Sequence, residues 1–418
     1  MKLMILGAGF NQCHAINKIK EMGYIAVAAD NREDSPGKKL AAISCLASTF
    51  SYEESLACAK KEAVDGIYTT GTDQPVYIAA RVAKTLHLPS NLGVEEALLV
   101  TNKLQMKRRL AQCNLPAVSY QVVNQNTQPQ DCDVAFPAVL KPVDSQGQRG
   151  IFYLESREQL PTLIGESLRY SRQKDALLET YYHSDEICVS AWVHKSESKV
   201  LSVTDRVRFS DKSHLGICQA HEYPSRHLSV LEPELTRLTQ EVAWGFGLRE
   251  GPLYVQFLWG EQGLKINELA ARIGGAYEDV YLERCMNLDL ASMQIEDALG
   301  LLHHHRGWRA YQRPATLHMS VELFFAQPGV IRTHNELAEL KSLPGMVDVQ
   351  IQVEIGDRVQ ELHTASQRIG YAIIRGKSKQ EWEQRVSLFY RTLYLKDDLG
   401  KNLVYQREVK SVEGNGCK

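Results

Sequence analysis

Three short segments combine charged side chains with glycines or strand-like patterns, and the first of them is suited to binding phosphate. In FPAVLKPVDSQGQRGI, an apolar strand ends near Lys141. The loop that follows holds Ser145, Gln146, Gly147, Gln148 and Gly150. Glycine lets backbone N–H groups approach phosphate oxygens, and a lysine at a strand end adds a fixed positive charge. The segment indicates a polyphosphate-binding loop, although a solvated hairpin gives the same pattern.

The second segment, LLETYYHSDEICVSAWV, consists of two apolar strands separated by a short polar break. Glu179 and Glu186 stand on either side of this break. Backbone groups exposed at such a break can pair with an adenine, while Glu186, seven positions after Glu179, can accept hydrogen bonds from ribose hydroxyls. The pattern indicates a nucleotide-binding hinge, and two solvated strand ends are the alternative.

The third segment, GPLYVQFLWGEQGLKINELAARIGG, predicts two strands joined by a tight turn. Gln256 and Glu268 lie about equally far from the turn, so we expect them to face one another across the hairpin. Two opposed oxygen ligands suit Mg²⁺ that also binds phosphates. Arg272 follows four residues after Glu268, where its guanidinium fork can hold a phosphoryl group or a carboxylate.

The first hundred residues alternate short apolar runs with helix-length amphipathic stretches, which predicts parallel βαβ units. Strands are expected at 3–6, 25–29 and 66–70, with a helix at about 11–22. Ligands bind beyond the carboxyl ends of such strands, so Asp73, in the loop after the third of them, is a substrate-binding candidate. Gln12 replaces the third glycine of a dinucleotide fingerprint, which leaves nicotinamide or flavin binding as a weaker alternative.

The pattern changes after residue 100 and again after residue 310, so we expect several domains. A basic helix is predicted at about 102–111, followed by hairpin-like strands. From residue 315 the chain returns to alternating strands and ends in a helix at 379–394. We predict domains at 1–100, 101–310 and 311–409, with a lid subdomain at about 115–185 and a disordered tail at 410–418.

Composition favours a globular enzyme that acts on small molecules. The 418 residues carry a formal net charge of −2, which gives no field for nucleic acid or an anionic membrane. Nine cysteines without a C-x-x-C pair favour reduced thiols over a disulfide framework or a zinc site. The chain starts directly with a strand and has no apolar run of about 18 residues, so a cytoplasmic location is expected. His303, His304 and His305 are adjacent and would point in different directions on a helix, which argues against a metal site.

Taken in order, these residues resemble the ATP-grasp superfamily. The segments VELFFAQPGVI, LPGMVDVQIQVEIGDRV and RIGYAIIRG are similar to the C-terminal domain of L-amino acid ligases. The resemblance covers nearly the whole chain and implies an α/β and α+β fold. Its parts would be a Rossmann-like N-terminal domain, an ATP-grasp fold of two α+β subdomains, and a C-terminal antiparallel β/α domain.

The resemblance also implies a role for each matching residue. Lys103 and Lys141 would contact the phosphates of ATP, and the loop at 145–150 would close over them. Glu179, the backbone near Tyr182, Glu186 and Leu258 would bind the nucleoside. Gln256 and Glu268 would hold Mg²⁺ or Mn²⁺, and Glu268 and Arg272 would act in catalysis. Weaker matches suggest substrate contacts at four positions, namely Asp73, Arg206, Gly274 and Gly275.

The function implied by the resemblance is that of an ATP-dependent carboxylate–amine ligase. Such an enzyme activates a carboxylate as an acyl phosphate, passes it to an amine and releases ADP and phosphate. An amino-acid ligase acting on small-molecule carboxylates and amines is the leading expectation, with a homodimer as its expected assembly. A bicarbonate-activating enzyme that makes carboxyphosphate and a non-catalytic nucleotide-binding module are the alternatives. Gln256 is neutral where many members have an acid, which leaves the number of metal ions open.

Overall fold

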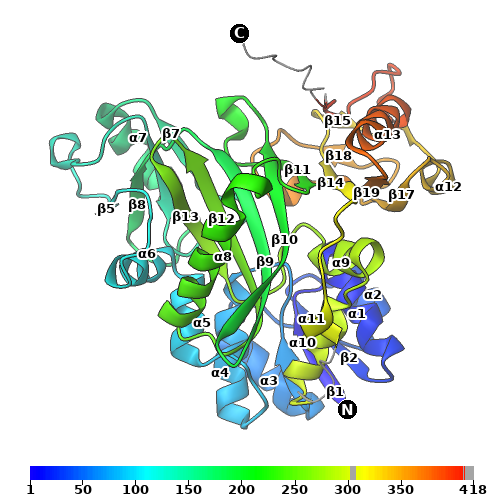
Figure 1. The fold of residues 1–418 in the computed structure, drawn as a ribbon, viewed down its shortest axis with the longest axis horizontal. Coiled ribbons are helices and arrows are strands. Elements are labelled where there is room, and N and C mark those ends of the chain that lie inside the picture. Colours follow the sequence, from blue (N-terminus) through cyan, green and yellow to red (C-terminus); the bar gives the residue numbers. More distant parts are fainter. Residues whose placement is uncertain (302–306, 408, 410–418) are drawn as a thin grey trace. The chain divides into compact units, whose positions relative to one another are not determined.

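The computed structural model describes residues 1–301, 307–407 and 409, which divide into two compact units (Figure 1). Unit 1 comprises Met1–Val203 and His227–Arg313, and unit 2 comprises Thr204–Arg226 and Pro314–Lys418. The histidine triplet at 303–305 and the tail at 410–418 lie outside the described residues. This division into two units does not test the domain boundaries expected from the sequence, which stay a prediction.

Unit 1 begins with a parallel four-stranded sheet in the order β3-β2-β1-β4. Leu3 in β1 pairs with Ala26 in β2 and with Gly66 in β4, and the apolar residues of β1 are fully buried. The predicted strands and first helix are confirmed to within two residues. The elements are β1 (Lys2–Leu6), α1 (Phe10–Glu21), β2 (Ile25–Asp30), α2 (Pro36–Leu40), β3 (Ile43–Leu46), α3 (Tyr52–Glu62), β4 (Gly66–Tyr68) and α4 (Gln74–Leu86).

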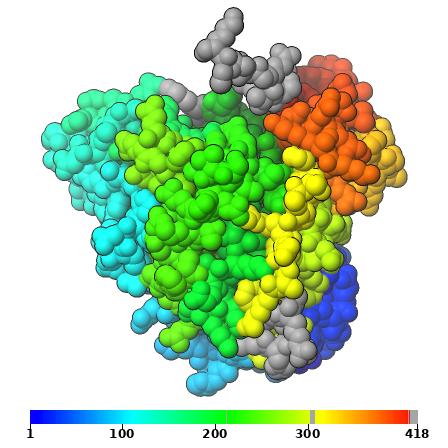
Figure 2. Space-filling view, in the orientation of Figure 1, coloured from blue at the N-terminus to red at the C-terminus, as the bar shows by residue number. Residues whose placement is uncertain are grey.

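Two consecutive helices lead from this sheet into a small antiparallel sheet in the order β5-β8-β6-β7. Both β5 and β6 pair with β8, and α7 packs against the sheet. Figure 2 shows this segment, in cyan to teal, beside the green part of the same unit. The elements are α5 (Val94–Thr101), α6 (Lys103–Gln112), β5 (Tyr120–Val123), β6 (Ala138–Pro142), β7 (Phe152–Leu154), α7 (Leu160–Leu168) and β8 (Ala176–Thr180).

The remainder of unit 1 is built on long antiparallel strands in the order β13-β12-β9-β10. Alternate residues of β9 and β12, such as Val189 and Val255, are buried with the apolar face of α8. The elements are β9 (Asp185–His194), β10 (Glu197–Arg208, whose last residues belong to unit 2), α8 (Leu228–Gly245), β12 (Glu250–Gly260), β13 (Gly263–Ala270), α9 (Glu278–Met286), α10 (Leu290–Ala298) and α11 (Gly307–Ala310).

Unit 2 is an antiparallel β/α domain, as the sequence predicts. Its strands follow the order β10-β11-β14-β19-β17, and α13 packs on β19 through Trp382, Val386 and Phe389. The elements are β11 (Cys218–Tyr223), β14 (His318–Phe324), β15 (Gly329–Val330), β16 (Thr333–His334), α12 (Leu337–Lys341), β17 (Met346–Ile351), β18 (Arg358–Val359), β19 (Gly370–Gly376), α13 (Lys379–Thr392) and β20 (Leu395–Lys396).

One pair of cysteines departs from the sequence-based expectation. Cys45 in β3 and Cys58 in α3 form a disulfide, with their Cα atoms 6.4 Å apart. The prediction that all thiols are reduced is therefore wrong for this pair. Cysteine spacing could not reveal the pair, because the two residues meet only when α3 packs against β3.

No helix within residues 1–301 or 307–407 is long and apolar enough to cross a membrane.

Candidate functional site

The hairpin of β12 and β13 places Gln256 directly opposite Glu268, as the spacing around the turn predicts. The register shifts just beyond this pair, because Phe257 pairs with Ile266 and Asn267 is the extra residue on β13. A bulge of this kind redirects side chains locally. Asn267 accepts a hydrogen bond from Lys141 at 3.2 Å, so the bulge brings a further oxygen to the same place.

Glu268 is held by a lysine from a different element. Lys103 is the first residue of α6, and its Nζ lies 2.5 Å from Glu268 Oε1 and 3.1 Å from the carbonyl oxygen of Ser145. The helix starts there because Asn102 caps it by accepting a hydrogen bond from the N–H of Gln105. Burial raises the pKa of the Glu268 carboxyl, but Lys103, Lys141 and Arg272 together lower it by more. Glu268 is therefore ionised at neutral pH and available to a cation.

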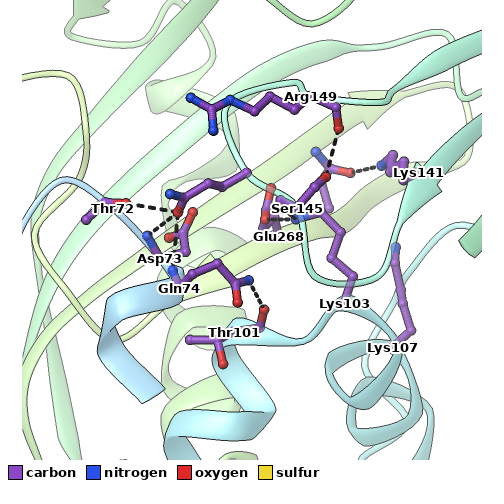
Figure 3. A network of polar contacts seen from close by, with 12 residues as sticks. Thr72, Asp73, Gln74, Thr101, Lys103, Lys107, Lys141, Ser145, Arg149 and Glu268 are labelled. Atoms are coloured by element: carbon purple, nitrogen blue, oxygen red, sulfur yellow. Dashed lines mark hydrogen bonds and ion pairs between the residues drawn. The ribbon is translucent and has the colours of Figure 1, made fainter. Parts of the chain in front are cut away.

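A second ion-pair group lies where β6, β8 and α6 meet. Lys141 donates to Glu179 Oε2 at 2.8 Å, and Lys107 Nζ lies 3.3 Å from Glu179 Oε1. Glu179 is only 3% exposed. Burial raises the pKa of its carboxyl, yet Lys107 and Lys141 together lower it to about 2. Figure 3 shows Lys103 and Lys107 extending from the same helix toward this region.

The loop at 145–150 follows β6 and contains three residues with positive φ: Gly147, Gln148 and Gly150. At Gly150 a Cβ atom would also lie 2.8 Å from the carbonyl oxygen of Ser167, so both conformation and space require glycine. The Oε1 atom of Gln146 accepts hydrogen bonds from the Thr72 hydroxyl and from the N–H groups of Asp73 and Gln74. The loop is thereby attached to the N-terminus of α4.

Arg272 lies just after β13 and pairs with Asp73, with Nε donating to Oδ1 at 2.8 Å. Its guanidinium also stacks on the ring of Tyr254 at 5.2 Å. Burial lowers the pKa of Arg272, but Asp73 and other groups raise it by more, so the guanidinium keeps its charge. The structure thus brings the substrate candidate Asp73 to the catalytic candidate Arg272.

The two predicted glycines after Arg272 permit close packing. A Cβ atom on Gly274 would overlap the carboxyl group of Glu278, and one on Gly275 would lie 3.0 Å from the carbonyl oxygen of Gly71. Glu278 accepts a hydrogen bond from the N–H of Ala276 at 2.8 Å. Burial raises the pKa of Glu278 to about 7. The loop from Arg272 to Glu278 therefore packs closely against the backbone at Gly71 and against the Glu278 carboxyl group.

The polar break predicted between Glu179 and Glu186 is present, since β8 ends at Thr180 and β9 begins at Asp185. Tyr182 in this break donates through its hydroxyl to the carbonyl oxygen of Gly263 at 2.8 Å. Glu186 pairs in register with Leu258, and both side chains are about 8% exposed. These contacts join the break to the β12–β13 hairpin.

Comparison with known proteins shows a similar fold and a family model that matches part of the chain. Residues 322–394 match the model of L-amino acid ligase C-terminal domain 2. The L-arginine-specific L-amino acid ligase of Bacillus subtilis is 23% identical over 322 residues, which are 72% of this chain and 73% of that protein. The structure of an L-amino acid ligase from Bacillus licheniformis superposes with a TM-score of 0.82 at 15% identity, over 95% of this chain and 98% of that one.

A biotin carboxylase domain is also similar in structure. The Hydrogenobacter thermophilus 2-oxoglutarate carboxylase domain, a dimer in complex with MgADP, ADP and bicarbonate, has a TM-score of 0.73 at 17% identity. It matches 94% of this chain and 90% of that one. The chain has the ATP-grasp fold. The proteins to which it is similar include two L-amino acid ligases.

In this ATP-grasp chain, most of the predicted site residues gather within unit 1. The exception is Arg206, which belongs to unit 2 and donates there to the carbonyl oxygen of Gly216 at 2.8 Å. Its role in substrate binding stays a prediction, as do the individual roles of the other residues.

Sequence reasoning missed Lys107 and Glu278. Lys107 follows Lys103 by four positions, which places both on one helix face and was an available signal. Glu278 begins α9 and looks like an ordinary acidic residue at a helix start, so no sequence signal distinguished it.

Proposed function

We propose that this protein is an ATP-dependent carboxylate–amine ligase that forms an acyl phosphate, and that its substrates are amino acids or related compounds. The observation that carries the proposal is the gathering of Lys103, Lys141 and Arg272 around the Gln256–Glu268 pair. Three cations beside two opposed oxygen ligands suit a nucleoside triphosphate with its metal ion. The ligase relatives and the MgADP complex of a structural neighbour support the choice of nucleotide.

The residues present fit a magnesium ion. Gln256 and Glu268 face each other on adjacent strands and offer an amide oxygen and an ionised carboxylate, the ligand types that Mg²⁺ prefers. Among the described residues no group of three or more His, Cys, Asp or Glu side chains is placed to hold a metal, so phosphate oxygens and water would complete the shell. When bound, Mg²⁺ would neutralise charge on the phosphates.

Each side chain then has a defined task. Lys103 and Lys141 exchange their carboxylate partners for phosphate oxygens and hold the triphosphate in place. Arg272 binds the acid so that a carboxylate oxygen attacks the γ-phosphorus in line, and ADP leaves. The loop at 145–150 covers the acyl phosphate until the amine attacks its carbonyl carbon and phosphate leaves.

An ADP-release screen tests this proposal against the two alternatives. Acids drawn from amino acids and hydroxy acids are combined with amino acids and polyamines as amines, and bicarbonate is tested separately. We expect ADP formation that requires both an acid and an amine. ADP formation with bicarbonate alone would favour a carboxyphosphate-forming enzyme, and no ADP with any combination would favour a non-catalytic module.

A further inference from the structure

Glu179 is a buried carboxylate with two lysine partners that differ in their access to solvent. The Lys141 side chain is 15% exposed, whereas the Lys107 side chain is 2% exposed. Lys141 also donates to Asn267 on the β12–β13 hairpin, next to Glu268. Lys141 therefore borders the proposed nucleotide site, while Lys107, which belongs to α6, is buried beside Glu179.

The two lysine ammonium groups repel each other, and both neutralise the Glu179 carboxylate. Burial lowers the pKa of Lys107, and the nearby charge of Lys141 lowers it further, while Glu179 offsets part of this effect. A single carboxylate thus holds two ammonium groups that repel each other. Bringing phosphate oxygens to Lys141 would relieve that repulsion, provided that Glu179 keeps one partner.

A buried carboxylate that loses its only cation is strongly destabilised. If Lys141 were the only partner of Glu179, moving it to a phosphate would leave such a charge behind. With Lys107 in place, the Glu179–Lys107 pair stays neutral whether or not Lys141 departs.

From this arrangement we propose that Lys107 is a positioning residue: it is the permanent counter-ion of Glu179 and thereby allows Lys141 to transfer to the phosphates of ATP. The inference rests on the proposed function, because it requires ATP at this site. It also assigns Glu179 an electrostatic role, which differs from the adenine contact that the family resemblance implies.

Removing Lys107 tests the inference through the binding of ATP. In Lys107→Met, Lys141 must stay on Glu179, so affinity for a non-hydrolysable ATP analogue with Mg²⁺ should fall by about tenfold or more. The double variant Lys107→Met with Glu179→Gln has no buried carboxylate to neutralise, so its affinity should lie within about threefold of that of Glu179→Gln alone. Calorimetric titration measures both affinities. If Lys107 had a purely structural role, Lys107→Met would lower the affinity for the analogue equally in the presence of Glu179→Gln.

Two further variants keep the test decisive if Lys107→Met fails to fold. Glu179→Gln alone is the reference for the double variant, and a further tenfold loss of affinity when Lys107→Met is added to it would overturn the inference. Arg108→Met, at an exposed position on the same helix, is the matched control and should bind as wild type does. If Lys107→Met binds as tightly as wild type, the inference alone fails. If wild type does not bind the analogue, the proposed function fails with it.

Discussion

Three carboxylates of the site have a cationic partner before any ligand enters. Lys103 holds Glu268, Lys141 and Lys107 hold Glu179, and Arg272 holds Asp73. These pairs avoid the cost of unpaired charges in a partly buried place. They also keep the lysines and the arginine in position, so that phosphate oxygens need only replace the carboxylates.

Replacing Glu268 by Gln tests its proposed metal role. The amide keeps the size of the side chain but removes the negative charge, so we expect folding to persist and the rate of ADP formation to fall by about a hundredfold or more, equivalent to roughly 3 kcal/mol of barrier. The measurement is steady-state ADP release with a productive acid and amine. High Mg²⁺ should restore part of the rate if the defect is metal occupancy. A rate close to that of wild type would remove Glu268 from the metal site.

At this scale the sequence predicted what depends on local spacing. The pairing of Gln256 with Glu268 followed from their equal distance from the turn, and the register confirms it. The ion pair between Lys103 and Glu268 could not be predicted, because it joins residues 165 positions apart. Its formation depends on how α6 packs beside β13.

At the scale of the element, the loop at 145–150 and the start of α4 form one connected feature. Gln146 supplies a single oxygen that satisfies two N–H groups at the start of α4 and the hydroxyl of Thr72. Helix starts leave such N–H groups without partners in the helix itself. Opening of the loop would therefore expose donors that water or a substrate oxygen must satisfy.

Alanine substitutions at two glycines separate backbone strain from packing in this loop. Gly147 and Gly150 both have positive φ, near 66° and 72°, but only Gly150 lacks room for a Cβ atom. We expect Gly147→Ala to lower the free energy of opening the loop by about 1 kcal/mol. Gly150→Ala should lower it by more and should also weaken the affinity for ATP. Hydrogen exchange of the loop and nucleotide titration measure these effects. Equal effects of the two substitutions would show that the contact with Ser167 does not matter.

For several helices and strands, the sequence patterns were sufficient to predict the element. Alternating and helical periodicities located β1, β2 and β4 of the first sheet, α6 and α13, because each buries a regular apolar face, but they did not locate β3. The glycines at 147 and 150 marked the loop correctly. The attachment of Gln146 to α4 was not visible, since glutamine in a glycine-rich loop carries no information about a distant helix.

At the scale of the whole molecule, a buried ionisable group affects the free energy of unfolding. Glu278 has a pKa raised by burial from 4.5 to about 7. A carboxyl whose pKa is raised in the folded state favours folding when it is protonated, and this stabilisation is lost as pH rises from about 4.5 through 7.

Glu278→Gln should therefore stabilise the protein increasingly as pH rises. The amide oxygen can still accept the hydrogen bond from Ala276, while no charge needs to be buried. We expect little difference from wild type near pH 4.5 and a gain of up to about 3 kcal/mol in the free energy of unfolding by pH 8. Chemical denaturation across this pH range is the measurement, with the exposed Glu261→Gln as control. A variant that is less stable than wild type at pH 8 would contradict the expectation.

Activation of a carboxylate as an acyl phosphate is tested by supplying a productive acid labelled with ¹⁸O in its carboxylate, together with ATP and the amine, and analysing the phosphate by mass spectrometry. In the proposed reaction one carboxylate oxygen attacks the γ-phosphorus and leaves with phosphate when the amine attacks. We expect one ¹⁸O in the phosphate for each amide formed. Unlabelled phosphate alongside amide formation, or ¹⁸O recovered in AMP, would contradict it.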